Sequence, residues 1–152
     1  HTSDRQRPMF APAALSQSAS PAFAGAYRTV GVETGVPAAS PHRLVTMLFD
    51  GFNEAIAQAR GALARRDIEA KCKAIGRAVR IVDEGLKAAL DVDAGGALAA
   101  DLAALYGYVA VRLTEANLHN DSRALDECAA LLEPVRSAWI AIDPAAAAAE
   151  VQ

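Results

Sequence analysis

The feature that most constrains this chain is a stretch of 92 residues, between Pro41 and Pro134, that contains no proline. Proline lacks a backbone donor and kinks or breaks a helix, so a proline-free stretch is where long helices can form. Apolar residues recur there at spacings of three and four, which is the period of one helix face. Alanine, the strongest helix former, supplies 37 of the 152 residues. The sequence therefore predicts an all-α fold.

Capping signals divide this stretch into four helices. Ser40 and Pro41 open the first, because serine accepts hydrogen bonds from free amides and proline at the first helical position needs no donor. Asp67 and Asp121 are expected to cap the second and fourth helices, and the third is expected over residues 97–118. Short turns join the four helices, which favours antiparallel packing of neighbours.

These patterns predict an antiparallel four-helix bundle over residues 40–142, preceded by a flexible arm over residues 1–39 and followed by a tail over residues 143–152. Pro134 falls inside the fourth helix, where we expect a kink or a break. The apolar spacing places these residues in the core: Leu48, Val79, Leu105, Leu132 and Trp139.

Motifs for catalysis or metal binding are absent from the sequence. A di-iron bundle needs paired Glu-x-x-His motifs, and neither His42 nor His119 completes one. The chain has no P-loop, no dinucleotide-binding glycine motif and no Gly-x-Ser-x-Gly elbow. Cys72 and Cys128 are expected to be small buried thiols. We therefore expect no catalytic residues, no metal and no cofactor, and a protein that is not an enzyme.

Charge and hydropathy narrow the partners further. A net charge of −3 gives no reason to expect nucleic-acid binding. The longest uncharged run within the helical region, residues 102–111, is far shorter than the roughly 20 residues that cross a membrane. Residues 8–27 are uncharged and follow two arginines, but proline and serine interrupt them, so we expect an arm and not a signal peptide.

The expected third helix is apolar over more of its surface than a bundle requires. A bundle helix buries one apolar stripe, yet Asp101 and Arg112 are the only charges over residues 97–113. Tyr106 and Tyr108 lie on opposite sides of that stripe, which favours a partner on at least one side. Two explanations stay open, namely alanines that are harmless at the surface and an apolar surface that binds a partner.

Several segments follow one another in a specific order. They are Ala26-Tyr27, ASPHRLVTMLFDG (residues 39–51), KAIGRAVRIV (73–82), Gly95-Gly96 opening LAADLAALYGYV (98–109), RLTEANLHND (112–121) and LDECAALLEPVRSAW (125–139). In this order and spacing, over roughly residues 26–142, the chain resembles the FliS family of flagellar secretion chaperones.

The resemblance implies an antiparallel four-helix bundle that binds the C-terminal segment of flagellin. That segment is disordered when free, becomes helical on the bundle, is kept from premature polymerisation in the cytoplasm and is delivered to the flagellar export apparatus. Spare apolar surface on a bundle is what helix-in-groove recognition requires. The charge and hydropathy of the chain, as given above, predict no nucleic-acid partner and no membrane insertion. The alternative is a self-associating structural or adaptor bundle, whose extra apolar face is a homodimer interface.

Some positions depart from the family pattern. Phe49 stands where many members have tyrosine, and Ala97 stands where a glutamate commonly follows the two glycines. The arm before Tyr27 is long for the family, and the link over residues 34–40 is longer than in some members. These departures concern the N-terminal arm more than the bundle.

We expect flagellin to contact apolar residues off the core stripes: Tyr27, Val45, Phe49, Phe52, Tyr106, Tyr108 and Val111. Phe52 also belongs to the expected core stripe. The segment from Tyr27 to Val36 is expected to fold back near the start of the first helix as an extended lid over part of this surface. Because apolar area would drive the contact, binding should survive high salt.

Overall fold

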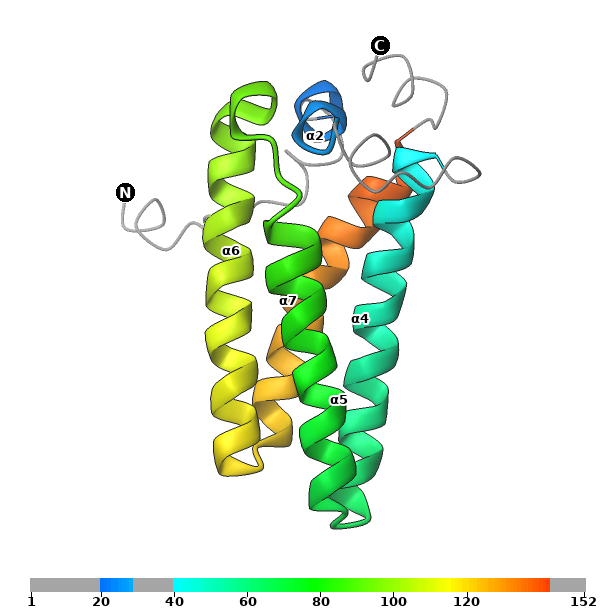
Figure 1. The fold of residues 1–152 in the computed structure, drawn as a ribbon, viewed down its shortest axis with the longest axis vertical. Coiled ribbons are helices and arrows are strands. Elements are labelled where there is room, and N and C mark those ends of the chain that lie inside the picture. Colours follow the sequence, from blue (N-terminus) through cyan, green and yellow to red (C-terminus); the bar gives the residue numbers. More distant parts are fainter. Residues whose placement is uncertain (1–19, 29–39, 143–152) are drawn as a thin grey trace, which may run out of the picture.

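The computed structural model describes residues 20–28 and 40–142 (Figure 1). Within them lie α2 (Ser20–Ala26), α4 (Pro41–Ala64), α5 (Ile68–Arg80), the π-helix η2 (Ile81–Lys87), α6 (Val92–His119) and α7 (Ser122–Ala141). Neither described range contains a strand, which confirms the predicted all-α class. The long helices form a four-helix bundle in which η2 continues α5, and α2 lies at one end of the bundle (Figure 1).

Side-chain caps form where the sequence predicts them. Ser40, Asp67 and Asp121 each accept a hydrogen bond from a backbone amide two or three residues later. A further cap was not predicted: Asp91 Oδ1 accepts from the amide of Ala94 at 3.0 Å, so α6 begins at Val92, before the predicted residue 97. Gly96 interrupts the first turns of α6 with a φ of 57°, a left-handed value that glycine adopts without strain.

The buried face of α4 is turned from the predicted one. Leu105, Leu132 and Trp139 are buried as predicted, but Leu48 and Val79 are only partly buried. The α4 core consists instead of Val45, Phe49, Phe52, Ala55, Ile56, Ala59 and Ala62. Because α4 packs against both α5 and α7, it buries a wider face than one stripe. Leu48 still contributes at the edge, where its Cδ2 would lie only 2.9 Å from a Cβ added to Gly85.

The start of α5 also differs from its predicted orientation. Cys128 is buried as predicted, but Cys72 is exposed, so the predicted burial of Cys72 is wrong. Lys71 is buried in its place, and its ammonium donates to the backbone carbonyl of Asn117 at 2.8 Å. A cation suits the carboxyl end of a helix, and Asn117 lies in the last turn of α6. With this polar contact, the buried face at the start of α5 includes Lys71, one residue before the predicted Cys72.

Two further features of the long helices bear on the predictions. Pro134 lies inside α7, which continues through it to Ala141, so no break occurs there. By length and composition α6 could cross a membrane, although the core helix of a bundle passes the same test. Here α6 buries one face in the bundle, including Leu102, Leu105 and Val109.

The N-terminal region departs from the expected flexible arm. Residues 20–26 form a helix, and Phe23, Ala26 and Tyr27 are almost fully buried. This helix packs against α6 and α7. From residue 29 onward the expected lid segment lies outside the described residues, as does the expected tail.

Candidate functional site

The end of the bundle beneath α2 is an aromatic cluster. Trp139 of α7 meets the ring of Phe23 edge-on at 4.9 Å and the ring of Tyr27 edge-on at 5.4 Å, measured between ring centroids. His42 of α4 stacks on Trp139, and Trp139 Nε1 donates to the backbone carbonyl of His42 at 3.0 Å. The predicted core position of Trp139 is thereby confirmed, with α2 covering it.

A buried chain of hydroxyl groups fixes α2 to the bundle. The Tyr27 and Tyr106 hydroxyls lie 2.9 Å apart, and the Tyr27 hydroxyl lies 3.0 Å from the backbone carbonyl of Leu86 in η2. A phenol has a single proton to donate, so Tyr106 donates to Tyr27 and Tyr27 donates to Leu86. The Leu86 carbonyl is free for this bond because the amide of Leu90, its ordinary helical partner, donates to Lys87 instead. The end of η2 therefore supplies the acceptor that holds Tyr27.

Both phenols are harder to ionise than an exposed tyrosine. Burial raises the pKa of Tyr27 well above its usual value, and the neighbouring Tyr106 raises it further. Burial also raises the pKa of Tyr106. The two hydroxyls therefore remain neutral and paired over the physiological pH range.

The raised phenol pKa values predict that high pH releases α2. A group whose folded-state pKa is raised contributes stability that is complete below its unfolded pKa, about 10 for tyrosine, and that is lost as the pH climbs beyond it. The midpoint of urea unfolding should therefore fall between about pH 9 and pH 11. It should fall less in the double variant Tyr27→Phe, Tyr106→Phe, which has no phenol to ionise at this site. If the urea midpoint falls equally with pH in the parent and in the double variant, these phenols do not cause the loss of stability at high pH.

Glycine allows α2 to approach α6 closely. A Cβ on Gly95 would lie 2.7 Å from the Cβ of Ala99 and 2.9 Å from the Cβ of Ala26. The amide of Asp91 donates to the carbonyl of Ala26 at 2.7 Å, which anchors the end of α2 at the same place. Only a residue without a Cβ lets both contacts form.

Replacing Gly95 by alanine is therefore expected to loosen α2, because the added methyl group overlaps Ala26 and Ala99. The cost in free energy of unfolding should be about 1–3 kcal/mol, measured by chemical denaturation. Gly107→Ala is the matched control. Its Cβ would meet only the Lys87 Nζ, at 3.5 Å, so this change should be neutral or stabilising. A Gly95→Ala protein as stable as the parent would count against the close packing of α2 on α6.

The structure separates the seven predicted contact residues into two groups. Tyr108 and Val111 are exposed, to 48% and 59%. The other five are buried: Tyr27, Val45, Phe49, Phe52 and Tyr106. Tyr27 and Tyr106 are brought together beneath α2. Val45 and Phe49 form part of the core, so their predicted position off the core stripe is wrong, whereas Phe52 lies in the core stripe to which it was also assigned.

Sequence reasoning missed Phe23, Leu86 and His42. Phe23 and Tyr27 stand four residues apart, which is one turn of a helix, and this spacing could have indicated a short amphipathic helix in the arm. The Leu86 carbonyl had no signal in the sequence, because its availability follows from the local π-helical hydrogen bonding.

A second surface runs along the outside of α6. Ala100, Ala104, Tyr108, Val111 and Leu118 are all exposed and follow a helical spacing. We call these five residues the α6 outer stripe. The first four are spaced by three or four residues, whereas the exposed Glu115 separates Leu118 from Val111. Clustered exposed apolar residues mark interaction surfaces more often than isolated ones do.

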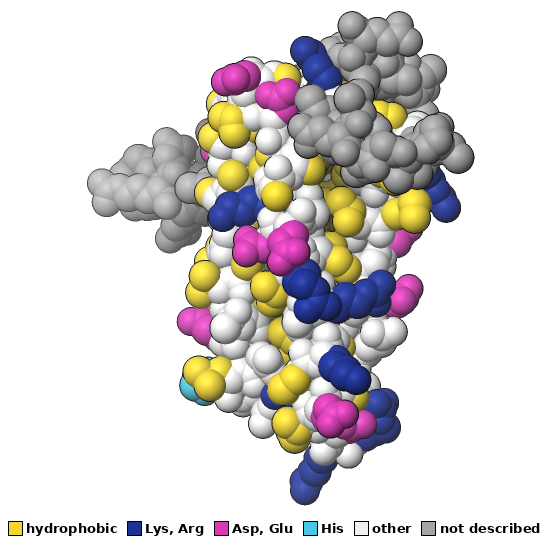
Figure 2. Space-filling view, viewed as in Figure 1, with side chains coloured by type: hydrophobic (Ala, Val, Ile, Leu, Met, Phe, Trp, Pro, Cys, Tyr) yellow, Lys and Arg dark blue, Asp and Glu magenta, His cyan; other side chains and the backbone are white. Residues whose placement is uncertain are grey.

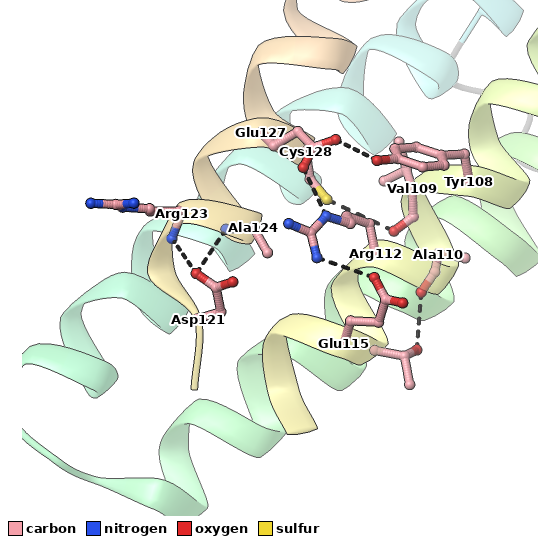
Figure 3. A network of polar contacts seen from close by, with 11 residues as sticks. Tyr108, Val109, Ala110, Arg112, Glu115, Asp121, Arg123, Ala124, Glu127 and Cys128 are labelled. Atoms are coloured by element: carbon pink, nitrogen blue, oxygen red, sulfur yellow. Dashed lines mark hydrogen bonds and ion pairs between the residues drawn. The ribbon is translucent and has the colours of Figure 1, made fainter. Parts of the chain in front are cut away.

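Arg112 of α6 forms one ion pair with α7 and one within α6, close to Tyr108 of this stripe (Figure 3). Arg112 Nε lies 2.7 Å from Glu127 Oε1, and Arg112 Nη1 lies 3.1 Å from Glu115 Oε1. The Tyr108 hydroxyl donates to Glu127, a bond that ties this residue of the stripe to α7. The Tyr108 hydroxyl and then Arg112 lower the pKa of Glu127, and the carboxylate in turn raises the pKa of Tyr108.

Nothing at either surface has the features of a reactive centre. Burial raises the pKa of the Cys128 thiol to about 12, so this thiol is inert at neutral pH. Residues 20–28 and 40–142 hold no group of three or more His, Cys, Asp or Glu side chains placed to bind a metal. The described residues form a helical bundle, with a short helix packed over one end and exposed apolar residues along one side.

Comparison with known proteins identifies the family. Residues 23–146 match the family described as flagellar protein FliS, and the match includes Phe23 and Tyr27 of the α2 region. The chain therefore belongs to the FliS family.

Named relatives agree with this assignment. The flagellar secretion chaperone FliS of Salmonella typhimurium is 47% identical over 121 residues, which cover 80% of this chain and 90% of the relative. The flagellar secretion chaperone FliSB of Pseudomonas aeruginosa is 48% identical over 113 residues, 74% of this chain and 89% of the relative. The Escherichia coli flagellar secretion chaperone FliS is 39% identical over 114 residues, 75% of this chain and 84% of the relative.

Proposed function

We propose that this protein is a flagellar export chaperone that holds the C-terminal segment of flagellin in the cytoplasm, keeps it from polymerising and presents it to the export apparatus. Its role is binding and not catalysis. The observation that carries the proposal is α2, a short helix that buries aromatic side chains in the end of an otherwise complete bundle. A site that accepts one amphipathic helix of its own chain has the shape to accept another.

In this proposal α2 acts as a lid. The client helix displaces it and packs on the surface that Phe23 and Tyr27 cover, which includes Tyr106 and Trp139. A second part of the client lies along the α6 outer stripe, where Tyr108 and Val111 are already accessible. Val45, Phe49 and Phe52 are assigned to the core, because their burial keeps them from a client while the bundle is closed.

The test is to titrate the purified chain with a synthetic flagellin C-terminal segment and to determine affinity and stoichiometry by calorimetry. The proposal predicts saturable one-to-one binding that gains helix by circular dichroism. Affinity should be nearly unchanged between about 0.1 M and 1 M salt, because the contacts are apolar. Affinity that collapses with modest salt, or absence of binding, would contradict the proposal.

The alternative of a self-associating bundle is tested in the same preparation. Sedimentation of the free chain over a wide concentration range gives its oligomeric state. If the α6 outer stripe is a homodimer interface, Val111→Asp should convert a dimer to a monomer. If the stripe binds flagellin, the same variant should weaken the complex and leave the free chain unchanged.

A further inference from the structure

The groove between α4 and α5 carries a concentration of positive charge outside the surfaces that we propose for flagellin. It has a volume of about 680 Å³, and its walls include Arg65 from the end of α4 together with Lys73, Arg77 and Arg80 from α5. No carboxylate lines it, although the whole chain has a net charge of −3. Figure 2 looks onto this face and shows Lys and Arg side chains gathered along α5.

Two glycines allow the arginines to lie within the groove. Arg65 Nη1 would be 3.2 Å from a Cβ added to Gly61, and Arg80 Nη1 would be 3.7 Å from a Cβ added to Gly76. Each guanidinium therefore lies over a glycine of its own helix, one turn back. The lining of the groove therefore consists of cationic side chains beside small residues.

Most of these cations have no acidic partner in residues 20–28 and 40–142. Arg77 is paired with Glu54 at 3.2 Å, whereas Arg65, Lys73 and Arg80 make no ion pair there. Glu69 and Glu84 stand four residues beyond the two ends of the α5 row and limit its extent. An incoming carboxylate could therefore pair with three of the four cations without breaking an existing ion pair.

The spacing of the α5 cations fits a helix better than a nucleic acid. Lys73, Arg77 and Arg80 follow one another at four and three residues, so they rise along one face of α5 at intervals of about 6 Å and about 4.5 Å. Carboxylates at the same spacing on a second helix would match them. No aromatic side chain lines the groove to stack on bases, and the chain's net negative charge opposes a polyanion.

We propose that the α4–α5 groove is a docking site for an acidic amphipathic helix of a partner protein, separate from the surfaces that hold flagellin. The carboxylates of that helix pair with Arg65, Lys73 and Arg80. Its small apolar side chains pack against the alanines that line the groove, Ala57, Ala70 and Ala74. Because the flagellin surfaces lie on α6 and under α2, both partners can be bound together. The chain then connects flagellin to a second, acidic protein.

The probe for this site is a fluorescein-labelled, alanine-rich helical peptide that carries glutamates at spacings of three and four on one face. Its counterpart carries glutamine at the same positions. Anisotropy at low salt should show saturable binding of the glutamate peptide, at least about tenfold tighter than the glutamine peptide, and a steep loss as salt is raised. No saturable binding, or equal binding of both peptides, overturns the proposal.

Charge reversal locates the contact. The variant Lys73→Glu, Arg80→Glu should lose at least about tenfold in affinity for the glutamate peptide. The matched control is Arg43→Glu, Arg123→Glu, which changes net charge equally at exposed positions of α4 and α7 and should have little effect. Equal loss in both variants would show a general charge effect and overturn the proposal. A neutral variant, Lys73→Gln, Arg80→Gln, repeats the test with less change in charge, and circular dichroism verifies the fold of each protein.

Two further measurements distinguish this site from a nucleic-acid surface and from part of the flagellin site. A labelled single-stranded oligonucleotide that bound more tightly than the glutamate peptide would identify a nucleic-acid surface and overturn the proposal. The Lys73→Glu, Arg80→Glu variant should bind the flagellin segment like the parent. Loss of flagellin binding in that variant would place the groove inside the flagellin site and overturn a separate docking site. If the parent fails to bind flagellin but still binds the glutamate peptide, the chaperone proposal fails and this one stands.

Discussion

Leu105→Ala and Leu132→Ala are each expected to lower the free energy of unfolding by about 2–5 kcal/mol. Both side chains are at most 2% exposed in the core, so truncation removes apolar contacts and leaves a cavity that the packed helices fill only in part. Val79→Ala should cost only about 1 kcal/mol, because Val79 is partly buried and loses a smaller group. Urea unfolding followed by circular dichroism measures all three. Equal losses for Leu105→Ala and Val79→Ala would contradict the burial pattern of the bundle.

Phe23→Ala is expected to tighten flagellin binding by at least about tenfold. Phe23 is fully buried and packs edge-on against Trp139, so its truncation weakens the packing of α2 on the bundle. The apparent dissociation constant is the intrinsic one divided by the fraction of molecules with the site open. Weakening the closed state by only about 1.4 kcal/mol already increases the open-to-closed ratio tenfold, provided that the closed state predominates.

The control for Phe23→Ala is Leu132→Ala, which destabilises the bundle two helical turns away from Trp139 without changing α2. It should leave flagellin affinity close to that of the parent while the protein remains folded. If Phe23→Ala weakens binding in a folded protein, α2 is part of the client site and not a lid.

The helices of the bundle could be predicted from sequence because their signals are local. A proline-free stretch, three side-chain caps and a three-four apolar spacing were enough to place four helices. Which face of each helix is buried depended on contacts between helices. On α4, two sets of apolar residues with the same spacing lie one residue apart: Leu44 with Leu48, and Val45 with Phe49. Either set could form the buried face. Packing against two neighbouring helices favours the second set.

The candidate site was harder to predict, because it depends on residues that are distant in sequence. Tyr27 and Tyr106 were both singled out, but their shared hydrogen bond spans 79 positions of the chain. The acceptor that completes it, the Leu86 carbonyl, exists only because the backbone of η2 changes its hydrogen bonding. At α5 a polar contact, Lys71 to the end of α6, accompanies the burial of Lys71 and the exposure of Cys72. The apolar pattern of the sequence alone predicts neither the hydrogen bonds of Tyr27 nor the orientation of α5.

A disulfide between α2 and α6 tests the central claim most directly. A Cβ built on Gly25 lies 3.7 Å from the Cβ of Ala94, a separation typical of disulfides, so Gly25→Cys with Ala94→Cys should lock α2 in place. The exposed Cys72 is first replaced by alanine to prevent mispairing. Flagellin-segment affinity is then measured by calorimetry on the oxidised and reduced forms of the same protein. If α2 is a lid that flagellin must displace, the reduced form binds and the oxidised form loses binding by about a hundredfold or more. Equal affinity of the two forms would show that flagellin binds without moving α2, and would contradict the account.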